Sequence, residues 1–202
     1  MHASFLKKTV LSAIFLVGML ADASAQLYPG QFAPSFSAKD IDGRFHSVEQ
    51  YKGRKILMTF YRNISSFPSL ARFLEIEQQK EYFRSKDIVV LAVFPSTKEV
   101  LQRFRDTAAY YQIIISDSEQ ALYRLFEIGD QASFRPKLLG HKKPAIKVEK
   151  SKLKGIEEKG MSDKAPADIL IDAGGNIFNS YYGKYESDHI PLSKLKELID
   201  SL

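Results

Sequence analysis

Residues 55–69 read KILMTFYRNISSFPS, an apolar run followed by small polar residues and a proline. The first seven of them predict a buried strand. The next residues predict the beginning of a helix, with Ser65 or Ser66 as its N-cap and Pro68 in its first turn. A reactive cysteine commonly stands at a junction of this kind, but Ser66 and Ser69 occupy the two positions concerned, and the chain contains no cysteine. Thiol catalysis is therefore excluded from the sequence alone.

Outside this stretch, short apolar runs alternate with amphipathic segments. Further strands are predicted at 87–95 and 112–117, in a hairpin at 167–183 that turns at 173–176, and in a smaller hairpin at 35–48 that turns at Asp42-Gly43. Helices are predicted at 66–85, 98–111 (with Thr97 as its cap), 118–129 and 192–202. This order predicts one α/β domain over residues 26–202, with a central mixed sheet flanked by helices and an antiparallel edge.

The N-terminus has the pattern of a cleavable export signal, predicted at residues 1–25. A short basic region precedes an uncharged run of 13 residues from Thr9 to Ala21, and small residues at 23–25 precede Gln26. Because a membrane-spanning helix needs about 20 apolar residues, a permanent anchor is not expected. The alternative is a buried N-terminal helix. We expect the mature protein to be cut after Ala25 and to be periplasmic or secreted, with its stability resting on its core because no disulfide can form.

The formal net charge of +5 is unevenly distributed. Residues 131–164 contain ten lysines and arginines against four acidic residues, so the sequence predicts a basic insertion in an otherwise near-neutral domain. No nucleic-acid-binding motif accompanies this charge, and nucleic acid is not expected as a partner. Two interpretations stay open, a solvated loop and a segment that contacts anionic lipid or an acidic partner.

Four stretches taken in order resemble one known family. They are PGQFAPSFSAKDIDGR (29–44), FYR (60–62), Pro166 with the following ADILIDAGGNI (167–177), and YYGKYESDHIPLSKL (181–195). Together they resemble the alkyl hydroperoxide reductase/thiol-specific antioxidant (AhpC/TSA) family, which contains the thioredoxin-like peroxiredoxins. The resemblance implies a thioredoxin-like fold whose site lies at the start of the first long helix, opposite a cis-proline.

The resemblance also implies positions for the site residues. Ser66 and Ser69 fall where the family has its first and second cysteines, and Arg62 matches a basic residue just ahead of the first cysteine. Pro166 matches the proline expected to be cis, before the strand at 167–172. This chain departs from the family pattern in having Phe67-Pro68 between the serines, and in having Asp168 where a threonine is common.

Serine cannot replace cysteine in peroxide reduction, because its hydroxyl does not ionise near neutral pH and has no sulfenic acid chemistry. A serine nucleophile would instead need a histidine base and a third orienting group. His46, His141 and His189 are available, but none lies in a recognisable motif. Ser66 is therefore interpreted as a helix cap, and the Asp188-His189 pair as a structural anchor for the last helix rather than a metal site. We expect no metal and no cofactor.

Two functional classes remain. The first is a redox-inactive module of peroxiredoxin ancestry that binds a peptide or an envelope protein at a surface formed by 62–69 and Pro166, since thioredoxin-like folds hold extended peptides by main-chain hydrogen bonds. The second is an enzyme that uses thiol-independent chemistry in the same pocket. The Asn63-Ile64-Ser65 triplet also matches a glycosylation acceptor.

Overall fold

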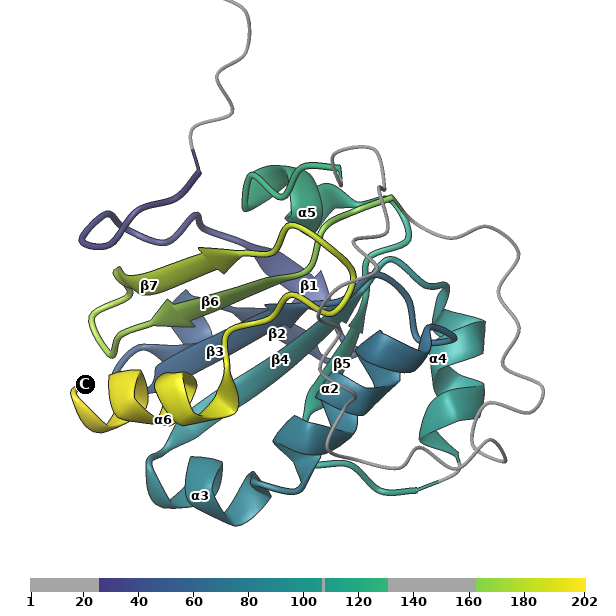
Figure 1. Cartoon of the computed structure of the whole chain (residues 1–202), viewed down its shortest axis with the longest axis horizontal. Helices are drawn as coiled ribbons and strands as arrows, with labels where there is room; N and C mark the ends of the chain where they lie inside the picture. The colour runs from purple at the N-terminus through teal and green to yellow at the C-terminus, as the bar shows by residue number, and fades with distance from the viewer. Residues whose placement is uncertain (1–25, 107, 131–162) are drawn as a thin grey trace, which may run out of the picture.

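The computed structural model of the chain describes residues 26–106, 108–130 and 163–202. The predicted export signal lies outside these residues, and so does the basic insertion except for its last two positions. Within them the chain forms a five-stranded sheet with helices on both faces (Figure 1). The strands are β3 (Lys55–Phe60), β4 (Ile88–Phe94), β5 (Ile113–Ser116), β6 (Ala167–Ile171) and β7 (Ile177–Tyr182). The predicted α/β fold with a mixed central sheet is confirmed.

The strands lie in the order β5-β4-β3-β6-β7. The pairs β3–β4 and β4–β5 are parallel, while β6 pairs antiparallel with both β3 and β7. In the β3–β6 pair, Thr59 lies directly opposite Asp168. The strands predicted at 55–61, 87–95, 112–117 and in the 167–183 hairpin therefore join one sheet, and the predicted antiparallel edge is the β6–β7 hairpin.

A second, two-stranded sheet lies beside the first, made of β1 (Ser37–Lys39) and β2 (Phe45–Ser47). Asp40 accepts hydrogen bonds from the backbone N–H groups of Asp42 and Arg44, and Gly43 has a φ of +89° that favours glycine. The predicted turn at Asp42-Gly43 is confirmed. A short 3-10 helix, η1 (Glu49–Tyr51), follows it.

The helices are α2 (Phe67–Glu77), α3 (Lys80–Ser85), α4 (Lys98–Arg105), α5 (Ala121–Leu125) and α6 (Leu192–Asp200). The prediction of one helix over 66–85 is wrong, because the chain leaves helical geometry at Gln79, where φ is −100° and ψ is 15°. No glycine or proline marks this break. Gln79 instead accepts a hydrogen bond from Lys196 of α6 (2.6 Å), and α3 turns Phe83 into the core. In the described part of the chain, no helix is both long and apolar enough to cross a bilayer.

Helices α4 and α5 are shorter than predicted. After α4 the chain folds back so that Tyr110 stacks on Phe104, with ring centroids 4.9 Å apart. Thr97 occupies the N-cap position of α4, as predicted, but its side chain makes no hydrogen bond to the helix backbone. The start of α5 is held instead by the carboxylate of Asp117, which accepts three backbone N–H groups of its first turn.

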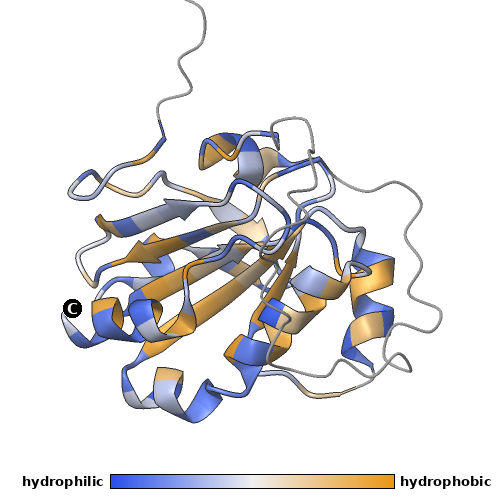
Figure 2. Cartoon of the chain, in the orientation of Figure 1, coloured by the Kyte–Doolittle hydropathy of each residue, from blue (hydrophilic) through white to orange (hydrophobic). Residues whose placement is uncertain are grey.

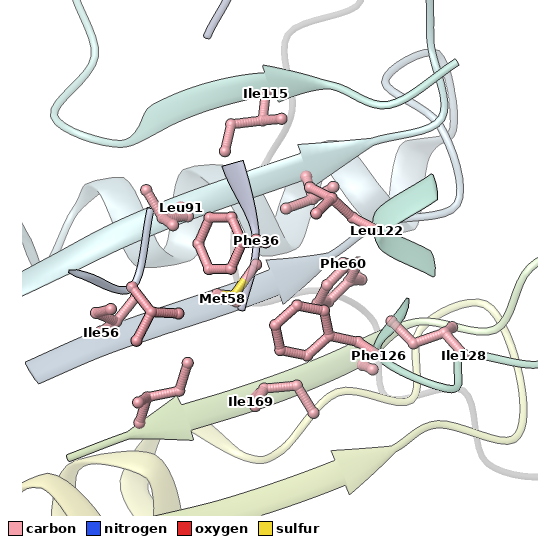
Figure 3. Packing of buried hydrophobic residues seen from close by; sticks show 14 of the residues in the cluster. Phe36, Ile56, Met58, Phe60, Leu91, Ile115, Leu122, Phe126, Ile128 and Ile169 are labelled. Atoms are coloured by element: carbon pink, nitrogen blue, oxygen red, sulfur yellow. The ribbon is translucent and has the colours of Figure 1, made fainter. Parts of the chain in front are cut away.

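The sheet is buried on both faces, as its long apolar strands require. Alternate residues of β3 point to opposite sides. Met58 and Phe60 pack with Phe36 from the N-terminal segment and Phe126 after α5 (Figure 3). On the other face, α2, α3, α4 and α6 cover the sheet with two apolar clusters. Figure 2 shows the apolar strands enclosed by helices that carry their polar residues on the outside.

Candidate functional site at the start of helix α2

Helix α2 begins at the two serines predicted to replace cysteines. Ser66 has an extended backbone and is the N-cap, and its hydroxyl oxygen accepts a hydrogen bond from the backbone N–H of Ser69 at 3.3 Å. Phe67 and Pro68 lie in the first turn. Proline lacks a backbone N–H, but N–H groups in the first turn have no acceptor within the helix, so no helical hydrogen bond is lost. The cap interpretation is confirmed for Ser66.

The approach to this cap is fixed by Asn63, whose side-chain oxygen accepts hydrogen bonds from the Ser66 N–H (2.6 Å) and the Ser65 hydroxyl (3.2 Å). Asn63 is only 2% exposed. The glycosylation triplet that begins at Asn63 is therefore closed to modification in the folded chain, because its acceptor side chain is buried.

A second segment reaches the cap from the loop between β7 and α6. The carboxylate of Glu186 accepts a hydrogen bond from the Ser66 hydroxyl, and its other oxygen lies 3.4 Å from Nη1 of Arg62. Arg62 is therefore close to Ser66, as the family resemblance implies, and Glu186 connects the two. Glu186 could not be predicted as a site residue because no local pattern pairs it with residues more than 100 positions away.

Beneath α2, Asp168 forms a buried charged cluster with Arg72 and His189. One carboxylate oxygen of Asp168 lies 3.5 Å from Nη2 of Arg72, and both lie 3.2 Å from Nδ1 of His189. The same carboxylate accepts the backbone N–H of Ile190 at 2.9 Å. Burial acts to raise the pKa of Asp168, but the charges of His189 and Arg72 and these hydrogen bonds outweigh it and lower the pKa to about 2. Asp168 is therefore ionised at neutral pH.

Four side-chain atoms around this cluster have no hydrogen-bond partner among the residues that the structure describes. They are Oγ1 of Thr59, Oγ of Ser69, Nε of Arg72 and Nε2 of His189, and they are the only buried side-chain polar atoms of the described residues in this condition. Ser69 is completely buried. The second serine therefore faces the interior, while Ser66 joins the surface loop.

Pro166 does not take the predicted role. The Ala165–Pro166 peptide bond is trans, since no described peptide bond is cis, and Pro166 is buried. Its carbonyl accepts the backbone N–H of Gly183 at 2.8 Å, which continues the β6–β7 pairing beyond Ala167. The prediction of a cis-proline is therefore wrong: the chain enters β6 through a trans bond.

The remaining predicted residues lie elsewhere. His46 is buried near the β1–β2 hairpin, between the Asp40 carboxylate (2.9 Å) and the Tyr51 hydroxyl (2.5 Å). His141 lies outside the described residues. Asp188 accepts hydrogen bonds from the Tyr181 hydroxyl and the Lys184 N–H, which agrees with its predicted structural role. The residues that the structure describes contain no cluster of three or more potential metal ligands.

The fold and the serine-capped helix define a thioredoxin-like domain without a thiol. Among solved structures, the chain is similar to a cysteine-to-serine mutant of PrxQ from Xylella fastidiosa (TM-score 0.64, 12% identity, 88% of this chain and 96% of that one). It is also similar to a putative thiol:disulfide interchange protein DsbE from Chlorobium tepidum (TM-score 0.59, 16% identity, covering 87% of this chain and 98% of that one). At these identities the likeness shows the fold alone.

Sequence comparison places the chain in a family. The AhpC/TSA family pattern matches residues 29–180, and the chain belongs to this family. It is 27% identical over 97 residues to a putative peroxiredoxin of Mycobacterium tuberculosis, a match that spans 48% of this chain and 62% of the relative. It is also 22% identical over 111 residues to peroxiredoxin Bcp of Escherichia coli K12, a match that spans 55% of this chain and 71% of the relative. The resemblance inferred from the sequence is confirmed.

Proposed function

We propose that this protein is an exported, redox-inactive member of the AhpC/TSA family that binds a peptide or protein partner at the start of α2. The observation that carries this proposal is the structural use of Ser66, whose hydroxyl caps α2 and binds Glu186. The residue at the family's nucleophile position thus connects the start of α2 to the loop after β7. Without cysteine the chain cannot form a sulfenic acid, so the peroxide chemistry of its lineage is lost.

The proposed binding area, called here the α2-start surface, consists of Arg62, Ser66, Phe67, Tyr185 and Glu186. Phe67 follows the cap and is 44% exposed, and Tyr185 precedes Glu186 and is 45% exposed. The bond between Ser66 and Glu186 brings these two stretches together. Exposed aromatic side chains beside partly buried charged groups are typical of protein-binding surfaces. Pro166 is buried, so the α2-start surface does not include it.

The test compares capture of partners by the mature protein, residues 26–202, and by the double variant Phe67→Ala, Tyr185→Ala. The immobilised proteins are incubated with an envelope extract of the source cells, and bound proteins are quantified by mass spectrometry. Recovery of a specific partner should fall by more than about tenfold in the double variant, because truncating an aromatic anchor costs about 2 kcal/mol.

The matched control is Phe45→Ala, since Phe45 is 60% exposed on β2 and lies outside the α2-start surface. This variant should capture the partner as the unchanged protein does. Equal capture by all three proteins, or no specific partner for any of them, contradicts the proposal.

A thiol-independent hydrolase is a second candidate, favoured by the contact between His189 Nδ1 and Asp168 and by the unpartnered atoms of Ser69 and His189. Its weakness is that Ser69 is completely buried and makes no hydrogen bond to His189. A fluorophosphonate probe that labels Ser69 in the folded protein, and not in the Ser69→Ala variant, would favour this candidate over the binding module.

A further inference from the structure

The N-terminal segment is held along the β7 edge of the sheet by hydrogen bonds. The Gly30 N–H donates to the Ile177 carbonyl, and the Ile177 N–H donates to the Gln31 carbonyl, both at 2.8 Å. Nearer the end of β7, the Ser180 hydroxyl donates to the Leu27 carbonyl at 2.5 Å. The backbone of this segment is therefore fixed on the sheet before any partner binds to its side chains.

Within this segment, a turn at Pro29-Gly30 presents two aromatic side chains to solvent. Gly30 has a φ of +93°, and the Gln31 N–H donates to the Tyr28 carbonyl at 3.5 Å, which is the pattern of a type II turn. Tyr28 and Phe32, on the two sides of the turn, are 64% and 79% exposed, more than any other large apolar side chain of the described residues. Figure 1 shows the turn at the edge of the molecule, beside the start of β7.

The sequence upstream of the turn indicates which apolar phase lies nearest to these rings. The uncharged run from Thr9 to Ala21 has the composition of a segment that enters a bilayer during export. Residues 22–27 alone separate the run from Tyr28, and an extended chain covers about 3.5 Å per residue, so the turn lies within about 25 Å of the end of the run. While the run is in the bilayer, the two rings are therefore held close to lipid.

The end of the sheet that carries the turn also suits lipid headgroups. Gly53 and Ala33 both donate backbone hydrogen bonds to the β6–β7 turn at 173–176, at 3.0 and 2.9 Å. Lys52, next to Gly53, is exposed, and a lysine beside interfacial aromatic residues can reach lipid phosphates. The carboxylate of Asp172 accepts a backbone N–H of the β6–β7 turn at 2.8 Å, so this acidic group is directed toward its own turn.

We propose that Tyr28 and Phe32 form a membrane-contact site that enters the interfacial region of a lipid bilayer. Aromatic side chains favour this region, because their rings reach the acyl boundary while polar groups stay at headgroup level. A turn already fixed by β7 loses little conformational freedom on contact, which favours binding by so small a surface. This inference goes beyond the proposed partner binding and does not depend on it.

A single tryptophan tests the site, because the chain contains none. The full chain carrying Phe32→Trp is mixed with phosphatidylcholine vesicles at high salt, where attraction between the basic insertion and lipid is screened. The tryptophan emission should shift to shorter wavelength and lose most of its intensity when the acyl chains are brominated. Binding through the run from Thr9 to Ala21 alone would leave this tryptophan in water, with its emission unchanged.

The matched control is Phe45→Trp, since Phe45 is 60% exposed and lies at the opposite edge of the sheet. Phe45 pairs with Lys39 in the β1–β2 hairpin, whose Asp40 forms a bridge to Ile115 of β5, whereas the aromatic turn lies on β7. The tryptophan of this variant should be neither shifted nor quenched by vesicles. An equal response of the two variants, or no response of Phe32→Trp, overturns the proposal.

Two further measurements separate this site from a protein-binding one. If the emission of Phe32→Trp is unchanged by vesicles but shifts when soluble envelope proteins are added, the turn binds protein and the proposal is overturned. Adding Phe67→Ala and Tyr185→Ala to the Phe32→Trp chain removes the aromatic residues of the α2-start surface and should leave the vesicle response unchanged. Failure of membrane contact is therefore distinguishable from failure of the proposed partner binding.

Discussion

The hydroxyl of Ser66 is hydrogen-bonded to the carboxylate of Glu186, although 120 positions of the chain separate the two residues. The same oxygen accepts the backbone N–H of Ser69 and so completes the first turn of α2. One hydroxyl therefore stabilises a helix terminus and attaches the loop that leads into α6. A position at which the family resemblance implies redox chemistry has a structural role in this chain.

Replacing Ser66 by alanine should lower the free energy of unfolding by about 0.5–2 kcal/mol, the usual effect of losing a helix cap. Urea denaturation measures the change. Thr97→Ala is the matched control, because Thr97 holds the N-cap position of α4 without a side-chain hydrogen bond to the backbone of that helix, and its replacement should change stability by less. Equal losses in the two variants would show that the Ser66 hydroxyl does not cap α2 in solution.

The protein should consume neither hydrogen peroxide nor alkyl peroxides in the presence of a thiol reductant. No residue of the chain can form a sulfenic acid, because cysteine is absent. Peroxide concentration is followed with chelators present, against heat-denatured protein. Steady consumption above this background would disprove the prediction.

The double variant Ser66→Cys, Ser69→Cys should form a disulfide that opens and closes reversibly. The two positions are the N-cap and the third residue of α2, where helix N-terminal N–H groups favour a thiolate. Thiol titration should find about two free thiols after reduction and none after mild oxidation, while each single variant keeps its thiol under the same oxidation. Two thiols that persist in the oxidised double variant would mean that Phe67-Pro68 holds the two side chains apart.

Removing the buried charge of Asp168 should lower the free energy of unfolding more than most single substitutions. Asp168→Asn removes one of the two carboxylates that pair with the buried Arg72 guanidinium, while Glu75 stays paired with it at 2.8 Å, and breaking a buried ion pair costs up to roughly 3–5 kcal/mol. The matched control is Asp87→Asn, because the Asp87–Arg54 pair is exposed and should contribute less than about 1 kcal/mol. A loss below 1 kcal/mol for Asp168→Asn, measured by denaturation, would contradict the importance of the cluster.

The same carboxylate predicts how stability depends on pH. Its pKa is lowered in the folded chain from 3.8 to about 2, so folding favours the ionised form. The contribution is fully present above the unfolded pKa and is lost as pH falls through about 2, because protonation then weakens the folded state. At about 1.4 kcal/mol per pKa unit it amounts to about 2 kcal/mol. Denaturation of the unchanged protein between pH 6 and pH 2 should show this loss, and Asp168→Asn should lack it.

The sequence predicts the sheet well because each strand of the sheet carries its own signal. The runs at β3 and β4 are apolar throughout, as buried strands require, and the turns at Asp42-Gly43 and 173–176 place glycine where φ is positive, at Gly43 and Gly175. Capping of α2 by Ser66 is also a local property, and it was predictable from the serine and proline alone.

What the sequence does not predict depends on contacts between distant segments. The break between α2 and α3 has no local breaker and follows from contacts with α6. In the sequence, nothing distinguishes Arg72 from other helical arginines, because its contact with Asp168 depends on how α2 packs on the sheet. The position of His189 in the cluster likewise depends on its contact with Asp168. Tertiary packing, not residue pattern, assembles the polar cluster.

Gly183 should not tolerate alanine, because the chain passes too close to itself there. A Cβ atom at this position would lie 2.2 Å from the backbone oxygen of Asp188 and 2.8 Å from Cγ of Pro166. The Gly183 N–H also donates to the Pro166 carbonyl, so the backbone cannot move away without losing this bond. Gly183→Ala should therefore lower the free energy of unfolding by about 3 kcal/mol or more, at or beyond the upper end of what overpacking usually costs.

The displacement forced by this alanine should also pull the loop after β7 away from α2. Glu186 and His189 both belong to that loop, so their contacts with Ser66 and Asp168 should weaken together, and amide hydrogen exchange in the first turn of α2 should accelerate. Gly129→Ala is the matched control, because no atom of the described residues lies within 4 Å of a Cβ atom there, and it should change stability by no more than about 0.5 kcal/mol. If the two alanine variants are equally stable, or if exchange in α2 is unaffected by Gly183→Ala, the loop does not hold the start of α2 in the way that these contacts indicate.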